Sequence, residues 1–336
     1  MRNRRRLIPA AFLAVPALAL AGCGSAGDQG DDVASGDAAT DEPTAPTFRI
    51  VASTSVYADI AQKIVGDAAV VEAIIDSASL DPHAYEATAQ DQLTIQDADL
   101  VIMNGGGYDV FMEGLIERAA TANVIEAVEY SHDYPGGHEH ADDDDHDHDD
   151  HDHDDHDDHG HIHGFNEHVW YDPHTIEHLV EAIRDTVADL EPELAEIVVD
   201  GADEVIANIA SLEDRLSSLE DAHAGATVFF TEPVGGYLAE AGGLIDVTVD
   251  GFAEAVEHGQ DVSPAVLLAA LTALEEDDVD VLVANAQTGG SETERMITEA
   301  ESLGIPVIEF TETLPDGLEY FGWMDANIDA LMDALG

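Results

Sequence analysis

A run of histidine and aspartate over residues 138–163 most constrains how this chain can fold. Ten histidines and twelve aspartates lie within it. A packed core cannot be built from such a segment, because almost no apolar side chain is present to offset the loss of chain entropy. The folded part is therefore expected over 48–336 without this segment, about 260 residues, which suits one large or two medium domains.

The chemistry of this His/Asp-rich loop indicates metal binding. Neutral imidazole is the commonest protein ligand for zinc and similar ions, and carboxylates add oxygen ligands and negative charge. The alternative is a solvated acidic linker, for which aspartate alone would serve. We expect auxiliary metal binding at its ten histidines: His138, His140, His146, His148, His151, His153, His156, His159, His161 and His163.

The first residues have the pattern of a bacterial export signal. Four arginines precede an apolar run, 7–21, which is too short for a stable transmembrane helix. The run ends in Leu-Ala-Gly-Cys, which resembles the lipobox of lipoproteins and implies cleavage after residue 22 and lipid on Cys23. An ordinary signal peptide with a chance cysteine is the alternative. Residues 23–47 then predict a flexible tether, and the chain is expected outside the cell membrane, anchored by this lipid.

Charge and cysteine content exclude several partners and sites. The net charge is −63, and removal of the signal leaves six basic residues against 73 acidic ones. Such a surface repels nucleic acid and anionic lipid and attracts cations, although a salty habitat could also explain it. Because Cys23 is the only cysteine, neither an intrachain disulfide nor a cysteine-rich zinc site is possible.

Short Val- and Ile-rich runs alternate with helical patterns in two blocks, which predicts an α/β fold with mostly parallel sheets. In the first block we expect strands at 48–52, 70–75, 99–104 and 124–127, and helices at 57–65, 89–95 and 110–120. In the second we expect strands at 227–230, 245–249, 279–284 and 305–310, and helices at 235–241, 264–274, 292–303 and 324–335.

A long helical segment separates the two blocks. Asp172-Pro173 supplies an N-cap and a first-turn proline, Pro192 interrupts the apolar periodicity, and a second helix follows over 195–222. This segment is long for a crossover and is interpreted as a rigid connector. The predicted division is an N-terminal lobe at 48–172, a connector at 173–223 and a C-terminal lobe at 224–336.

Four residues follow strands or precede the connector in a way that favours a metal site. Ligands bind at the carboxyl ends of parallel strands. His83 and His168 come from the first block, and Glu232 and Glu312 directly follow strands of the second. Two imidazoles and two carboxylates make a plausible four-coordinate site in the cleft between the blocks.

Each candidate also has a simpler interpretation. His83 could be a polar turn residue after Pro82, and His168 the end of the His-rich run. Glu232 could favour the dipole of the following helix, and Glu312 could be solvated. His174 and His178 have i, i+4 spacing, which permits shared metal binding, but exposed positions on the connector are the favoured interpretation.

Three motifs carry a resemblance to a known family. Residues 81–86 (DPHAYE), 167–173 (EHVWYDP) and 231–238 (TEPVGGYL) resemble those of the zinc/manganese solute-binding lipoproteins of bacterial ABC transporters. A His-rich loop between the first two histidine ligands is typical of the zinc members. The resemblance covers about residues 48–336. It implies two α/β lobes joined by a rigid helix, with the metal held between them at His83, His168, Glu232 and Glu312.

The resemblance is not complete. Many zinc members have a third histidine where this chain has Glu232, and manganese members often have aspartate where it has Glu312. Two carboxylates make the site more tolerant of Mn²⁺, whereas the His-rich loop favours Zn²⁺. Pro233 and the pair Gly235-Gly236 also differ from the commonest members.

The resemblance implies capture of Zn²⁺ outside the membrane and delivery to an ABC transporter permease, by a monomer without catalytic activity. A manganese-binding protein of the same class is one alternative, and a surface zinc buffer or adhesin is another. Uptake of a metal chelate or organic solute has little support. A zinc hydrolase is disfavoured, because no His-Glu-x-x-His helix occurs and a fourth protein ligand would close the site.

Overall fold

The structure is a computed structural model that describes residues 46–121, 123–135, 162, 164–276 and 279–336. The predicted signal peptide (1–22), Cys23, the tether up to residue 45 and the ten histidines of the His/Asp-rich loop lie outside the described residues. Among the residues described, no helix combines the length and apolar composition needed to cross a lipid bilayer.

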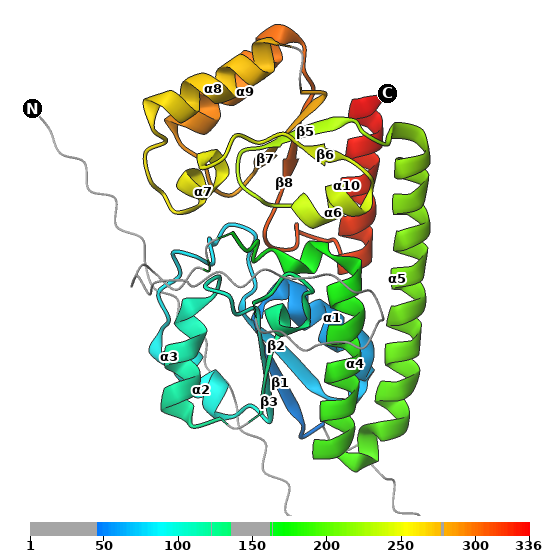
Figure 1. Ribbon diagram of the computed structural model, residues 1–336. Helices are drawn as coiled ribbons and strands as arrows, with labels where there is room; N and C mark the ends of the chain where they lie inside the picture. The colour runs from blue at the N-terminus through cyan, green and yellow to red at the C-terminus, as the bar shows by residue number, and fades with distance from the viewer. Residues whose placement is uncertain (1–45, 122, 136–161, 163, 277–278) are drawn as a thin grey trace, which may run out of the picture. The chain divides into compact units, whose positions relative to one another are not determined.

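The first sheet has four parallel strands in the order β2-β1-β3-β4 (Figure 1). These strands are β1 (Arg49–Thr54), β2 (Val70–Ile75), β3 (Leu100–Met103) and β4 (Val124–Glu126). Ile50 pairs with Val71 on one side and with Leu100 on the other. The predicted parallel sheet is confirmed, with strand ends shifted by one or two residues.

Alternate side chains of this sheet are buried under different helices. Ile50 and Ala52 of β1 pack in the core that includes α1 (Ser55–Val65), α4 (Pro173–Leu190) and α5 (Ala195–His223). Val51 faces the other way, toward α2 (Ala89–Gln96) and α3 (Val110–Ala119). Both faces are therefore covered, which explains why the strands are continuously apolar instead of alternating.

The second sheet repeats this plan, in the order β6-β5-β7-β8. Its parallel strands are β5 (Thr227–Phe230), β6 (Ile245–Asp246), β7 (Val281–Asn285) and β8 (Val307–Phe310). Strand β6 is shorter than the expected 245–249. Asp246 Oδ1 accepts the Thr248 N–H at 2.7 Å, and Thr248 Oγ1 accepts the Phe230 N–H at 2.8 Å, so side chains replace the strand ladder there.

Helices again cover this second sheet. They are α6 (Gly236–Ala241), α7 (Phe252–Glu257), α8 (Pro264–Glu275), α9 (Ser291–Leu303) and α10 (Tyr320–Leu335). Ser263 caps α8 by accepting the Val266 N–H at 3.3 Å. Helix α7 was not predicted from the sequence. Short 3₁₀ turns occupy Gly66–Ala68, Ala127–Tyr130, Val169–Tyr171 and Pro192–Leu194.

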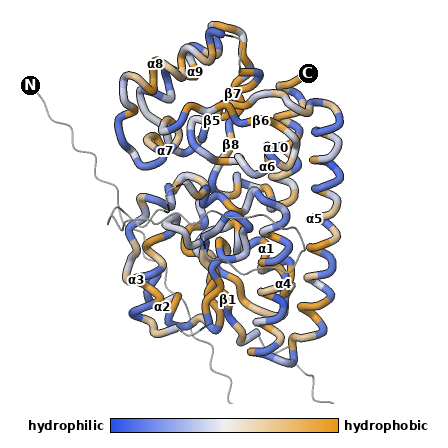
Figure 2. Tube along the Cα trace, viewed as in Figure 1, coloured by the Kyte–Doolittle hydropathy of each residue, from blue (hydrophilic) through white to orange (hydrophobic). Residues whose placement is uncertain are grey.

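Helix α5 runs along both sheets (Figure 1). It packs against α1 and α4 beside the first sheet and against α6 and α10 beside the second. Its apolar residues form a stripe toward the core, visible as the orange turns in Figure 2. At Gly201 the helix lies so close to α1 that a Cβ atom would meet the Ile64 carbonyl oxygen. Arg215 joins α5 to α10 through Asp325 and Asp329, each at 2.5 Å.

Candidate metal centre

Two short turns place the candidate histidines. His83 follows β2, and Asp81 Oδ1 accepts its backbone N–H at 2.9 Å. His168 precedes the Val169–Tyr171 turn, and Asn166 Oδ1 accepts its backbone N–H at 3.1 Å. In both cases a side chain two residues earlier caps the turn, which is the behaviour expected of Asp and Asn.

Asn166 also fixes the ring of His168. Its Oδ1 lies 2.8 Å from His168 Nδ1, so this nitrogen carries the proton and Nε2 is left as the available metal-binding atom. The same Asn166 donates through Nδ2 to the Pro233 carbonyl at 3.0 Å. Tyr237 Oη donates to the Asn166 carbonyl, also at 3.0 Å. The loop that carries His168 is thus bound directly to the loop that carries Glu232.

One amide holds the two candidate glutamates of the second block. Glu232 follows β5 and Glu312 follows β8, while Asn285 ends β7 between them. Asn285 Nδ2 lies 2.9 Å from Glu232 Oε2 and 2.6 Å from Glu312 Oε1. Thr288 Oγ1 donates to Glu232 Oε1. Three parallel strands therefore contribute neighbouring polar groups at their carboxyl ends, as the topology requires.

The structure brings three of the four predicted residues into direct proximity. His83 Nε2 lies 3.5 Å from Glu312 Oε2, and the His83 and His168 ring centroids are 6.2 Å apart. The Glu312 side chain is fully buried and that of His83 is 12% exposed. Glu232 is also buried and reaches this group through the shared Asn285 amide.

Glu257, which the sequence analysis missed, lies beside the same histidines. It ends α7, and its Oε1 is 3.7 Å from His168 Nδ1, with the side chain 6% exposed. Ligand atoms of His83, His168 and Glu257 all lie within 4.8 Å of one another. Glu257 does not directly follow a strand, because α7 lies between it and β6, so its position gave no signal in the sequence.

Burial and mutual repulsion raise the pKa values of three carboxyls at this centre. Burial raises the pKa of Glu312 to about 8, and Glu232 and Asp81 add to the rise by repulsion. Burial likewise raises the pKa of Glu257 to about 10, with repulsion from Glu167, Glu232 and Glu312. The pKa of Glu232 is raised mainly by burial, against the opposing effect of its hydrogen bonds. A divalent cation would supply the charge that these groups lack.

Aromatic rings form the wall behind the histidines. The rings of His83 and Tyr108 meet edge to face at 4.9 Å, and those of His168 and Trp170 at 5.1 Å. Tyr108 and Trp170 are fully buried. Such a wall restricts both imidazoles and lowers the local dielectric, which strengthens their interaction with a bound ion.

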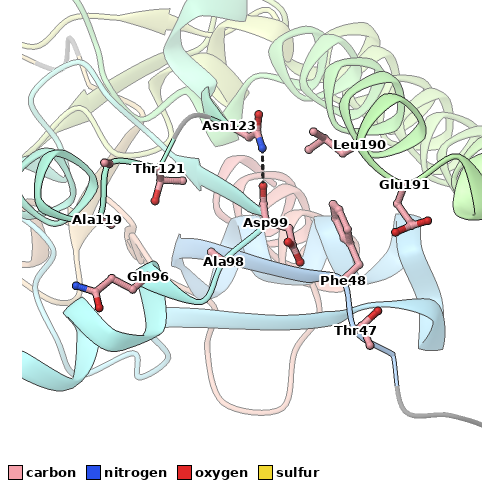
Figure 3. A pocket seen from close by; sticks show the side chains of 11 residues that line it. Thr47, Phe48, Gln96, Ala98, Asp99, Ala119, Thr121, Asn123, Leu190 and Glu191 are labelled. Carbon is pink, nitrogen blue, oxygen red and sulfur yellow. Dashed lines mark hydrogen bonds between the residues drawn. The ribbon is translucent and has the colours of Figure 1, made fainter.

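A polar hollow lies away from the candidate centre. It measures about 490 Å³ and opens at the amino-terminal edge of the first sheet, near Phe48 and Asp99 (Figure 3). Its lining includes Asn123, which donates to the Asp99 carbonyl at 3.0 Å, but no histidine. Ligand sites of parallel sheets lie at the opposite edge, where the candidate centre is found.

Comparison with known proteins gives the family. The chain belongs to the ZnuA family, described as "Zinc-uptake complex component A periplasmic", which matches residues 50–334. It is 24% identical over 331 residues to the manganese-binding lipoprotein MntA of Halalkalibacterium halodurans, covering 96% of each chain. It is 26% identical over 339 residues to the high-affinity zinc uptake system protein ZnuA of Bacillus subtilis, covering 98% of this chain and 96% of that protein.

Solved structures agree on the fold. The periplasmic zinc-binding protein TroA from Treponema pallidum superposes with a TM-score of 0.68 at 18% identity, covering 86% of this chain and 99% of the other. The predicted two-lobe α/β architecture and the family resemblance are thereby confirmed.

Proposed function

We propose that this protein captures Zn²⁺ outside the cell membrane and delivers it to an ABC transporter permease. Membership of a zinc-uptake family supports the transport role. The observation that carries the metal assignment is the buried group of two imidazoles and several carboxyls at the strand ends. Buried ionisable groups of this kind are costly unless they are paired or bind a metal.

We propose His83, His168, Glu232 and Glu312 as the ligands. The Nε2 atoms of both histidines and Oε2 of Glu312 are the donor atoms that the geometry favours, since Asn166 occupies Nδ1 of His168 and Asn285 occupies Oε1 of Glu312. Glu257 lies on the Nδ1 side of His168, together with Asn166. We assign it the role of orienting this imidazole and adding negative charge, as carboxylates behind metal-bound histidines do.

Mn²⁺ is the second candidate ion. Relatives of this chain are named for zinc and for manganese, and oxygen ligands suit manganese while imidazole suits zinc. A competition experiment between Zn²⁺ and Mn²⁺ on the same protein would show which ion binds more tightly. We expect Zn²⁺ to displace Mn²⁺, because divalent first-row ions bind nitrogen and oxygen sites more tightly toward the end of the series.

The proposed organisation follows the sequence. Residues 1–22 act as a lipoprotein signal, lipid on Cys23 anchors the chain, and 23–47 is a tether. The lobes at 48–172 and 224–336 supply the ligands, and 173–223 connects them. We propose a monomer that collects metal also on the His/Asp-rich loop, 138–163, and that performs no catalysis.

The test is tight zinc binding by the full chain. Zinc is added below one equivalent and partitioned against a high-affinity fluorescent chelator, so that the weak sites of the His/Asp-rich loop remain empty. Changing His83 and His168 together to alanine should abolish the tight equivalent, whereas His223→Ala, a surface change at the end of α5, should not. Retention of tight zinc by the double variant would overturn the proposed site.

The transport role needs a separate measurement. A strain from which this gene is deleted should grow poorly in zinc-depleted medium and recover when zinc is added. The wild-type gene should restore growth, and the His83/His168 double variant should not. Normal growth of the deletion strain under zinc depletion would contradict the role in uptake while leaving the binding site intact.

A further inference from the structure

Two histidines on α4 lie outside the candidate centre and face each other. His174 and His178 are one turn apart near the start of the helix, and their Nε2 atoms are 3.3 Å apart. The ring centroids are 4.5 Å apart with planes at 87°. Neither residue has a role in the function proposed above.

The distance between these two nitrogens matches the distance between two nitrogens bound to one zinc ion. Zn–N bonds of about 2.0–2.1 Å at a tetrahedral angle place two ligand nitrogens about 3.3–3.4 Å apart. An α-helix brings residues i and i+4 to the same face, so the helix itself holds this geometry. The first turn is firmly built, because Asp172 accepts the His174 and Thr175 N–H groups, each at 3.1 Å.

A carboxylate orients one of the rings for metal binding. Glu181 Oε2 lies 3.5 Å from His178 Nδ1. This contact favours a proton on Nδ1, which leaves the Nε2 lone pair of His178 directed at His174. A carboxylate on the far nitrogen of a histidine is the usual support of a metal-bound imidazole. In the metal-free pair, His174 Nε2–H then donates to His178 Nε2. Metal binding would require the other neutral tautomer of His174, with its proton on Nδ1, so that both Nε2 lone pairs face the ion.

A third imidazole and open space are available beside the pair. The His132 ring centroid lies 6.3 Å from that of His174. His132 is 57% exposed, so its side chain has room to turn. His174 also lines a hollow of about 240 Å³ together with Glu213, which leaves space for water molecules to complete the coordination.

We propose that His174 and His178 form a second metal site of the chain, with His132 as a third donor. Imidazole ligands select Zn²⁺ and similar borderline ions over Mn²⁺, Mg²⁺ and Ca²⁺. The proposed second site shares no ligand with the candidate metal centre. It is accessible from solvent, so it should exchange its ion more readily than that buried centre. This proposal stands independently of the function proposed for the candidate metal centre.

Histidine footprinting of the full chain tests the proposal residue by residue. Diethyl pyrocarbonate modifies accessible imidazoles, and mass spectrometry measures the rate at each histidine as Zn²⁺ is added beyond the first equivalent. At free Zn²⁺ about ten times the Kd of the site, modification of His174 and His178 should slow about tenfold, with one shared midpoint. His223 should remain unprotected, and Mn²⁺ at the same concentration should protect neither member of the pair.

Single variants decide whether the two rings act together. His178→Ala should remove the protection of His174, and His174→Ala that of His178, whereas His223→Ala should leave both protected. If zinc still protects one histidine after the other is replaced by alanine, the two rings do not bind one ion together, and the proposed site is wrong. Absence of protection in the wild-type chain, or separate midpoints for the two residues, would also overturn it without the need for any variant.

Discussion

Asn285 is the residue whose replacement tests the candidate centre most sharply without removing a proposed ligand. It is 5% exposed, and its single amide nitrogen contacts both Glu232 and Glu312. Asn285→Ala would leave both carboxylates in place but remove the donor that fixes their positions. We expect weaker zinc binding with little change in the fold, because water can enter the space that the amide vacates.

The size of the effect follows from the two contacts. A hydrogen bond to a charged group contributes about 1.5–3 kcal/mol. Glu312 is partly protonated before zinc binds, because its pKa is about 8, so the amide stabilises the loaded state more than the empty one. If the difference equals one such bond, the Kd for zinc should rise about 10–150-fold. Groups that support metal ligands show losses of about 10–100-fold when mutated.

The assay is competition with a fluorescent chelator at less than one equivalent of zinc. Asn123→Ala is the matched control, because it removes an amide that donates to the Asp99 carbonyl far from the centre. Circular dichroism of both variants confirms folding. A zinc Kd in Asn285→Ala equal to that of the wild type would refute the reasoning that this amide organises the two glutamates for metal binding.

Three further predictions follow from the same structure. Glu257→Gln keeps the shape of the side chain but removes the carboxyl that would ionise when zinc binds. It should weaken zinc binding about tenfold or more in the same competition assay. An unchanged zinc Kd would show that Glu257 does not contribute to the site. Gly201→Ala should lower the melting temperature by several degrees, because a Cβ would meet the Ile64 carbonyl oxygen of α1. An unchanged melting temperature would show that α5 can move away from α1 without loss of stability. In the zinc-free protein, the raised pKa of Glu312 favours folding below pH of about 4.5 and this contribution is lost as the pH rises through about 8. Through Glu312, the melting temperature should therefore be lower at pH 8 than at pH 5. Glu312→Gln should make the melting temperature less dependent on pH. An identical pH dependence in both proteins would contradict the raised pKa of Glu312.

Zinc affinity should have the opposite pH dependence. The histidines must be neutral and Glu312 ionised to bind the metal, so the affinity should fall as the pH drops from 8 to 5.5. The loss should begin above the ordinary histidine range because Glu312 takes up its proton near pH 8. A flat profile in the chelator assay between these values would contradict this account.

Most of the fold was predictable because its strands are buried on both faces. Continuous runs such as Val281–Asn285 stand out between helices, and Asp172 caps α4 as expected. Thr88 and Ser263 likewise cap α2 and α8. The shortness of β6 was not predictable, because the hydrogen bond of the Thr248 hydroxyl depends on a neighbouring strand. Helix α7 was missed since six residues carry too little periodicity to identify a helix.

The candidate centre was predictable where chemistry and topology coincide. His83, Glu232 and Glu312 follow strands, and the parallel sheets bring these strand ends together. Glu257 was missed because its role depends on α7, which the sequence did not indicate. The Asn285 and Asn166 amides were also missed, since neutral side chains give no metal-binding signal by themselves.

Helix α5 has a consequence for how an ion could leave. It packs against α1 beside one sheet and against α10 beside the other, without interruption over Ala195–His223. Parting the two halves like a hinge would break one of these helix contacts. We expect the exit to open locally instead, and the six-residue α7 is the segment that could move with the least loss of packing.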